Sequence, residues 1–369
     1  MTHPTTTPVQ HAKLSFLDRF LPVWILLAMG IGLALGHFVP EVGETLRAME
    51  VGGVSIPIAI GLLVMMYPPL AKVRYDKTGD ITRDRRLMAV SLVLNWLVGP
   101  ALMFTLAWVF LPDAPEYRTG LIIVGLARCI AMVLIWNDLA CGDREAAAVL
   151  VAVNSIFQVL MFGALGWFYL QILPGWLGLT TTSAEFSFWA IVTSVLVFLG
   201  VPLLGGALSR ILGEHAKSRE WYETHFLPRI SPLALIGLLY TIVLLFSLQG
   251  GRILSSPLSV ALLAVPLTLY FILMFALGLG ASRVAGLNYA RATTVAFTAA
   301  GNNFELAIAV AIGTFGPLSG QALAGTIGPL IEVPVLIALV YIMKWIGPRL
   351  FPNDSTLPHH IHASSQETP

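Results

Sequence analysis

The chain has 369 residues, of which 57% are hydrophobic and only 11% are charged, whereas a soluble domain carries roughly 25% charged residues. The formal net charge is +1 and no basic stripe is visible, which argues against a nucleic-acid partner. The two cysteines, Cys129 and Cys141, form neither a disulfide framework nor a C-x-x-C metal spacing. The composition therefore predicts an all-α polytopic membrane protein that carries no cofactor.

Ten segments are apolar for roughly the 20 residues that a helix needs to cross the lipid bilayer. The connections between them are short and leave no room for a soluble domain. Residues 1–18 and 352–369 are polar and are predicted to be disordered, and we expect no cleavable signal peptide before the first span. The predicted spans are 20–38, 51–71, 87–111, 118–138, 144–172, 186–212, 228–248, 258–281, 291–313 and 318–346.

Lys and Arg residues predict the orientation of these spans, because they are enriched in cytoplasmic loops. A cytoplasmic N-terminus places 17 of them inside and three outside, with Arg128 within a span. This bias predicts that both termini are cytoplasmic and that the number of spans is even. We expect the protein to lie in the cell membrane.

Weak internal similarity predicts two repeats, residues 19–172 and 186–346. Residues 57–63 resemble 232–239, and a shift of 174 residues aligns Cys129 with Asn303. Both pairings are five spans apart, and because five is odd the two halves are predicted to be inverted in the membrane. Inverted repeats are a recurrent plan of secondary transporters.

Polar residues interrupt the fourth and ninth spans near their middles, at 127–129 and 301–305. Gly and Asn tolerate non-helical dihedral angles, and such backbone survives in a membrane only where protein or a water-filled cavity satisfies it. We therefore expect two discontinuous helices that cross at the midplane around one small polar site.

The side chains near this site each have an alternative reading. Arg128 either pairs with Glu305 or Glu332 or serves the site, and it can do both. Cys129 is either a small filler or a thiolate favoured by the adjacent cation. Glu305 suits a proton carrier, and Glu332 is either a second proton site or a partner for Arg128.

Three further polar residues are candidates for the lining of the site. Trp136 shares a helical face with Cys129 if the helix is regular, but interfacial anchoring is the alternative. Asn154 and Ser155 either form interhelical hydrogen bonds or line the site.

Five motifs are similar to those of a known transporter family. The sequence resembles the arsenite efflux permeases of the arsenical-resistance-3 type, within the bile acid/arsenite/riboflavin transporter superfamily, from about residue 15 to residue 350. The motifs that carry the resemblance are MMYPPLAKV (65–73), GLARCIAMV (125–133), NSIFQV (154–159), NNFELA (302–307) and IGPLIEVP (327–334).

The resemblance implies ten helices in a panel domain and a core domain, and efflux of arsenite, in some members antimonite, driven by protons. The essential cysteine and acid of the family fall on Cys129 and Glu305. We expect the Cys129 thiol to contact arsenic(III), the substrate, while Asn302, Asn303 and Arg128 hold its hydroxyls. A sodium-coupled organic-anion carrier of the same fold is the alternative, and an enzyme is not expected.

Overall fold

The computed structural model describes residues 20–39, 41–51, 54–73, 83–130, 132–179, 188–255, 257–316, 318–352, 354 and 356–357, and this part of the chain is almost entirely helical. Six helical stretches are long and apolar enough to cross a membrane, and three shorter apolar helices accompany them. The protein is therefore a multi-pass membrane protein. The six stretches are Arg85–Phe110, Arg144–Trp176, Phe188–Ala216, Arg219–Gly251, Pro257–Val284 and Gly320–Leu350, and the shorter helices are Val23–Phe38, Ile56–Ala71 and Phe304–Phe315.

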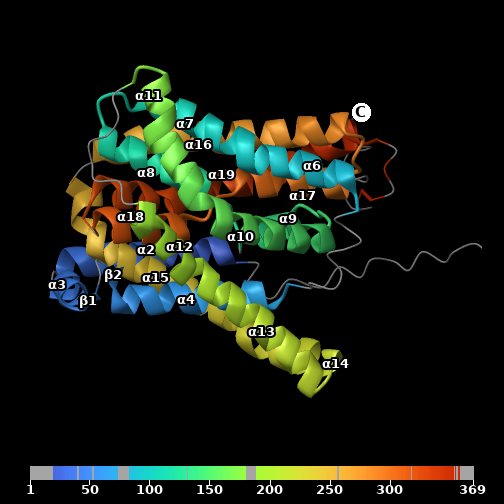
Figure 1. Cartoon of the computed structure of the whole chain (residues 1–369), viewed down its shortest axis with the longest axis horizontal. Helices are drawn as coiled ribbons and strands as arrows, with labels where there is room; N and C mark the ends of the chain where they lie inside the picture. Colours follow the sequence, from blue (N-terminus) through green and yellow to red (C-terminus); the bar gives the residue numbers. More distant parts are fainter. Residues whose placement is uncertain are drawn as a thin grey trace, which may run out of the picture.

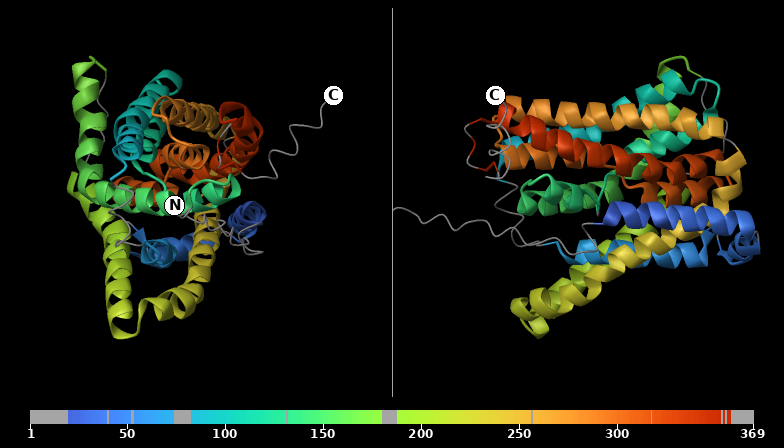
Figure 2. Two further views of the ribbon diagram at one scale, coloured as in Figure 1. Left: turned by 90° about the vertical axis from the view of Figure 1, so that its right-hand side faces the viewer. Right: turned by 180° about the vertical axis from the view of Figure 1, so that it is seen from behind.

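The helices form two groups, which the left view of Figure 2 shows one above the other. In the smaller group, which we call the panel bundle, α15 packs along α2 and α4, and α13 packs along α4 (Figure 1). The panel bundle contains α2 (Leu21–Phe38), α3 (Glu41–Ala48), β1 (Glu50–Val51), β2 (Val54–Ser55), α4 (Ile56–Ala71), α12 (Phe188–Val195), η3 (Leu196–Gly200), α13 (Val201–Ala216), α14 (Arg219–Trp221), η4 (Tyr222–Phe226) and α15 (Leu227–Ser255). We include α12 because it continues through η3 into α13, while its side faces α10 and α18 of the other group.

The larger group, which we call the core bundle, holds the helices with polar interruptions. Its closest pairs are α16 with α17, α18 with α19, α16 with α19, α8 with α19 and α7 with α8. The core bundle contains α6 (Arg85–Val93), η1 (Leu94–Val98), α7 (Gly99–Phe110), α8 (Pro115–Leu126), α9 (Met132–Leu139), α10 (Arg144–Trp167), η2 (Phe168–Ile172), α11 (Leu173–Trp176), α16 (Pro257–Val284), α17 (Tyr289–Ala300), α18 (Phe304–Phe315) and α19 (Gly320–Leu350).

Small residues bring the panel helices into backbone contact. A Cβ atom on Gly36 of α2 would lie 2.3 Å from the Ser247 carbonyl oxygen on α15, and one on Gly237 would lie 2.8 Å from the Met65 amide nitrogen on α4. Helices in a membrane associate through such close packing, because lipid removes the hydrophobic drive between them. The outward faces are correspondingly apolar, and Leu204 of α13 is 65% exposed.

Four π-helical turns share one cause. The segments η1, η2, η3 and η4 are each centred four residues before a proline, namely Pro100, Pro174, Pro202 and Pro228. A proline inside a helix lacks an N–H donor and its ring clashes with the carbonyl four residues earlier. Widening the helix at that carbonyl relieves the clash and lets the helix continue.

Two of the described segments differ from the sequence-based boundaries by more than four residues at one end. The second predicted span began at residue 51, but α4 begins at Ile56, because Val51 and Val54 pair as antiparallel strands. The seventh continues to Ser255 instead of ending at residue 248. The predicted disordered segment 1–18 and most of 352–369 lie outside the described residues.

Candidate functional site

The two broken helices meet at their interruptions in the core bundle. The first break lies between α8, which ends at Leu126, and α9, which begins at Met132. The second lies between Ala300, the last residue of α17, and Phe304, the first of α18. Both interruptions occur where the sequence predicts them.

Backbone hydrogen bonds join the two extended breaks into a short antiparallel bridge between Arg128 and Asn302. The Asn303 amide donates to the Ala127 carbonyl at 2.9 Å, and the Cys129 amide donates to the Gly301 carbonyl at 3.4 Å. These bonds satisfy backbone groups that neither broken helix can pair internally. The crossing therefore brings together two segments that are 174 residues apart in the chain.

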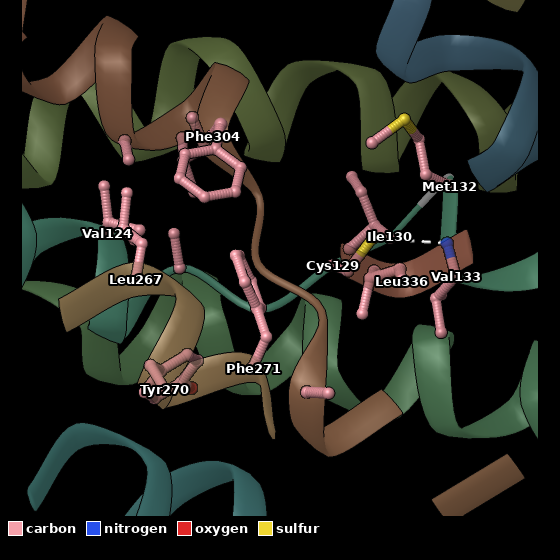
Figure 3. Close-up of a cluster of buried hydrophobic side chains, with 14 of the residues drawn as sticks. Val124, Cys129, Ile130, Met132, Val133, Leu267, Tyr270, Phe271, Phe304 and Leu336 are labelled. Atoms are coloured by element: carbon pink, nitrogen blue, oxygen red, sulfur yellow. Dashed lines mark hydrogen bonds between the residues drawn. The ribbon is translucent and has the colours of Figure 1, made fainter. Parts of the chain in front are cut away.

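Cys129 is buried at the crossing, and only 4% of the residue is exposed. Its sulfur accepts a hydrogen bond from the Val133 amide at 3.3 Å, in the first turn of α9 (Figure 3). Figure 3 also labels Ile130 and Leu336, which belong to the same buried cluster as Cys129. An amide at a helix N-terminus favours negative charge on a group that it contacts.

Arg128 is fully buried, and its hydrogen-bond partners are groups other than the carboxylates of Glu305 and Glu332. Its Nη1 donates to the Tyr270 hydroxyl on α16 at 2.8 Å, its Nη2 donates to the Gly125 carbonyl, and its amide donates to Gln158 Oε1. Among the described residues no ion pair joins Arg128 to an acidic side chain. The suggested pairing of Arg128 with Glu305 or Glu332 is therefore wrong for this structure.

The two carboxylates lie on neighbouring helices at the second break. Glu332 of α19 is fully buried, and its Oε1 accepts the Asn302 amide at 3.2 Å. Glu305 lies in the first turn of α18 and is partly exposed. The helix that carries Glu305 also contacts α12 of the panel bundle, so this side of the crossing faces the boundary between the bundles.

Asn302 and Asn303 stabilise the crossing in different ways. The Asn302 side-chain amide donates to the Val124 carbonyl at 2.8 Å and to the Ala127 carbonyl at 3.2 Å, across the first break. Asn303 caps α18, because its Oδ1 accepts the Leu306 amide at 3.0 Å. Each asparagine keeps one buried polar atom without a partner among the described residues.

The three remaining candidates are all buried in the core bundle but have different contacts. Trp136 is fully buried on α9. The Asn154 Oδ1 accepts the Trp96 indole N–H at 3.1 Å, whereas the Ser155 hydroxyl donates to Val151 of its own helix at 2.8 Å. Ser155 therefore has its donor occupied within α10.

Several buried polar atoms of the site have no hydrogen-bond partner among the described residues. Leaving such a group unsatisfied costs about 1–3 kcal/mol, so a concentration of them favours a site that receives a polar ligand. The atoms are Arg128 Nε, Trp136 Nε1, Asn154 Nδ2, Gln158 Nε2, Asn302 Oδ1, Asn303 Nδ2 and Glu332 Oε2.

Sequence reasoning missed Tyr270 and underrated Gln158. Tyr270 contributes the hydroxyl that holds Arg128, and Gln158 accepts the Arg128 amide across the first break. A lone tyrosine in an apolar helix such as α16 resembles ordinary packing. Gln158 does lie within the motif NSIFQV (154–159), one of the five that carry the family resemblance. That motif is the sequence feature that points to a role for Gln158.

A buried polar crossing in a multi-pass helical protein is typical of a membrane transporter. Comparisons with known proteins place the chain in the same class. Residues 59–256 match the sequence profile of the sodium bile acid symporter family. The arsenical-resistance protein Acr3 of Corynebacterium glutamicum is 69% identical over 366 residues, which cover 99% of both chains.

Two more distant relatives match across most of their length. Acr3 of Alkaliphilus metalliredigens, also an arsenical-resistance protein, is 37% identical over 339 residues, or 89% of this chain and 92% of its own. An uncharacterised transporter of Synechocystis is 36% identical over 354 residues, or 90% of this chain and 89% of its own. The chain therefore belongs to the sodium bile acid symporter family and groups with its arsenical-resistance transporters, as the sequence resemblance indicated.

Proposed function

We propose that this protein exports arsenite from the cytoplasm in exchange for protons, and that antimonite is a second substrate. The observation that carries the proposal is the helix crossing, where a buried thiol lies among polar atoms that lack partners within the described chain. The similarity to two arsenical-resistance proteins supports the same substrate.

The chemistry of the crossing suits this substrate. Arsenite at neutral pH is mostly an uncharged trihydroxide, and trivalent arsenic is a soft atom that prefers sulfur. In the proposed complex the Cys129 thiolate contacts arsenic, while Asn302 Oδ1, Asn303 Nδ2 and Arg128 Nε hold the hydroxyls. A single thiolate permits release, whereas a cage of three would retain the substrate.

Three other residues complete the proposed lining. Trp136 and Asn154 each offer a buried N–H that has no partner among the described residues. Ser155 contributes as an acceptor, since its own proton is donated to Val151. Together they would limit the size of the site and hold a polar, uncharged molecule.

Two carboxylates make the site suitable for proton coupling. Glu305 is the proposed carrier, because it lies at the second break and has no ion-pair partner in the described part of the chain. Glu332 is the proposed second proton site. Protonation from outside would release arsenite, and loss of the proton to the cytoplasm would restore the site for the next molecule.

The proposed topology has ten spans in two inverted five-helix repeats, with both termini in the cytoplasm and the protein in the cell membrane. The distribution of Lys and Arg supports the orientation. The two broken helices are five spans apart in this topology, which is what an inverted repeat requires. Transport would then proceed as the core bundle slides against the panel bundle.

Arsenite uptake into everted membrane vesicles tests the proposal. In everted vesicles, uptake corresponds to export from the cell. We expect accumulation to require an imposed proton gradient, with the lumen acidic, and to be independent of sodium. Flux that follows sodium instead, or no arsenite accumulation, would contradict the proposal and favour the organic-anion carrier.

A further inference from the structure

The guanidinium of Arg128 is held in a socket made by three elements of the core bundle. Nη1 donates to the Tyr270 hydroxyl on α16 at 2.8 Å, and Nη2 donates to the Gly125 carbonyl in the last turn of α8. The third wall is Gly99, at the start of α7. A Cβ atom there would lie 2.7 Å from Arg128 Nη1 and 3.1 Å from the Tyr270 hydroxyl oxygen.

This socket determines which donor of Arg128 is available at the crossing. Both terminal nitrogens have partners within the protein, so Nε is the guanidinium nitrogen without one in the described structure. The contact with Gly125 also places the positive charge at the C-terminal end of α8, where the helix dipole stabilises a cation. Arg128 therefore has a fixed position although no carboxylate pairs with it in the described part of the chain.

We propose that Tyr270 is a positioning residue for substrate recognition, because its hydroxyl and the space left by Gly99 fix Arg128 so that Nε donates to a substrate hydroxyl. This inference rests on the proposed transport of arsenite. Tyr270 itself touches no substrate in this arrangement and acts only through Arg128.

Removing the Tyr270 hydroxyl would leave a charged donor buried without its partner. Such a group is costly, so the guanidinium would move toward another acceptor. That movement would take Nε from the position at which it meets the substrate. We expect the weakened contact to raise the KM for arsenite and to change Vmax less.

Two variants test the inference in everted vesicles, and each has a matched control. For Tyr270→Phe we expect the KM for arsenite to rise roughly tenfold or more, as for a lost hydrogen bond to a charged group, with Vmax changed less than about twofold. Gly99→Ala should have the same effect. The controls are Tyr169→Phe, a buried tyrosine of η2, and Gly280→Ala, whose Cβ would have no neighbour within 4 Å.

A melting experiment on detergent-solubilised protein tests the coupling of Tyr270 to Arg128 without arsenite. If the two side chains act as a unit, Tyr270→Phe should add no destabilisation in an Arg128→Leu background. Additive effects on the melting temperature, or an unchanged KM in Tyr270→Phe, would overturn the positioning role. Wild-type vesicles that do not take up arsenite would overturn the proposed function, and with it the part of this inference that concerns the substrate.

Discussion

Cys129 offers a nearly isosteric test of the arsenic contact. A serine hydroxyl can accept the Val133 hydrogen bond that the sulfur now accepts, but oxygen lacks the affinity of a thiolate for a soft atom. We expect Cys129→Ser to fold normally and to lose arsenite uptake by roughly a hundredfold, the equivalent of about 3 kcal/mol. Uptake in everted vesicles and the melting temperature measure the two effects.

Cys141 provides the control for that variant. It lies between α9 and α10 with a φ of 59°, and burial raises the pKa of the Cys141 thiol, which makes it a poor thiolate at neutral pH. Cys141→Ser should therefore transport arsenite like the wild type. Full transport by Cys129→Ser, or its loss in Cys141→Ser, would contradict the assignment of the substrate thiol to Cys129.

Gly301 shows how little space separates the proposed ligand from the proposed proton site. A Cβ atom on Gly301 would lie 3.1 Å from the Cys129 Cβ and 3.6 Å from Glu332 Oε1. Its φ of −71° suits any residue, so the effect of a side chain there would be steric. We expect Gly301→Ala to raise the KM for arsenite several-fold, on the order of a 1 kcal/mol overpacking penalty.

The control for Gly301→Ala is Gly251→Ala, because a Cβ atom there would have no neighbour within 4 Å. Both variants should be measured for arsenite uptake in the same vesicle preparation. A KM that remains at the wild-type value in Gly301→Ala would show that the space between Cys129 and Glu332 is not used by the substrate.

At the residue scale, sequence reasoning could place Cys129, Asn302 and Glu305 because each is a polar side chain in an otherwise apolar span. It could not identify the partner of Arg128. The charges of Glu305 and Glu332 suggested an ion pair, whereas the observed partner is the neutral hydroxyl of Tyr270. Long-range contacts of this kind depend on side-chain packing, which composition and spacing do not encode.

At the element scale, the start of α17 depends on residues that follow the last helix. The Tyr289 amide donates to Asp354 Oδ2 at 2.5 Å, and the Ala290 amide donates to the Thr356 hydroxyl at 3.3 Å. Tyr289 also donates its hydroxyl to the Ala140 carbonyl at 2.9 Å, beyond the end of α9. These contacts connect the C-terminal segment to the outer ends of both half-helices that lead into the crossing.

The charge of Asp354 should contribute to stability in a pH-dependent way. Burial favours its neutral form, but hydrogen bonds from Thr356 and from the Tyr289 amide outweigh this and lower the pKa of Asp354. A lowered pKa in the folded state means that the stabilisation is present above the ordinary aspartate pKa, about 4, and is lost as the pH falls through the lowered value.

Melting of Asp354→Asn and of the wild type in detergent measures this contribution. At neutral pH we expect Asp354→Asn to be less stable by about 1 kcal/mol, because an amide keeps only one of the two acceptor oxygens and carries no charge. The difference should shrink as the pH falls from about 5 to about 3. A difference that persists unchanged in acid would show that the ionised carboxylate is not what stabilises the start of α17.

Some boundaries between elements could be predicted from the sequence and others could not. Gly301, Asn302 and Asn303 have a local effect on the backbone, so the interruption of α17–α18 was predictable. The interruption of α8–α9 contains neither Gly nor Asn, and it was predictable from the polar residues Arg128 and Cys129 in the middle of an apolar span. The four π-helical turns depend equally on local prolines, but a proline in an apolar span is as consistent with a kink or a helix end as with a π-helical turn. The strand pair before α4 was missed because two paired residues on each strand are too few to show a period.

At the scale of the whole molecule, α10 and α12 form a contact between the two bundles. A Cβ atom on Gly163 of α10 would lie 2.7 Å from Val192 Cγ2 of α12, close enough for a disulfide after both residues are changed to cysteine. If the core bundle slides against the panel bundle, this contact must slip in every transport cycle. A covalent bond at Gly163 and Val192 would then hold the two bundles in one arrangement.

We therefore expect Gly163→Cys/Val192→Cys, in a Cys141→Ser background, to lose arsenite uptake on oxidation and to regain it on reduction. The control is Leu33→Cys/Gly250→Cys, since a Cβ atom on Gly250 would lie 3.5 Å from the Leu33 Cα within the panel bundle. That bond joins two helices, α2 and α15, that move together if the bundle is rigid, so uptake should continue. Uptake that survives oxidation of the α10–α12 pair would mean that alternating access arises within the core bundle, around the crossing itself.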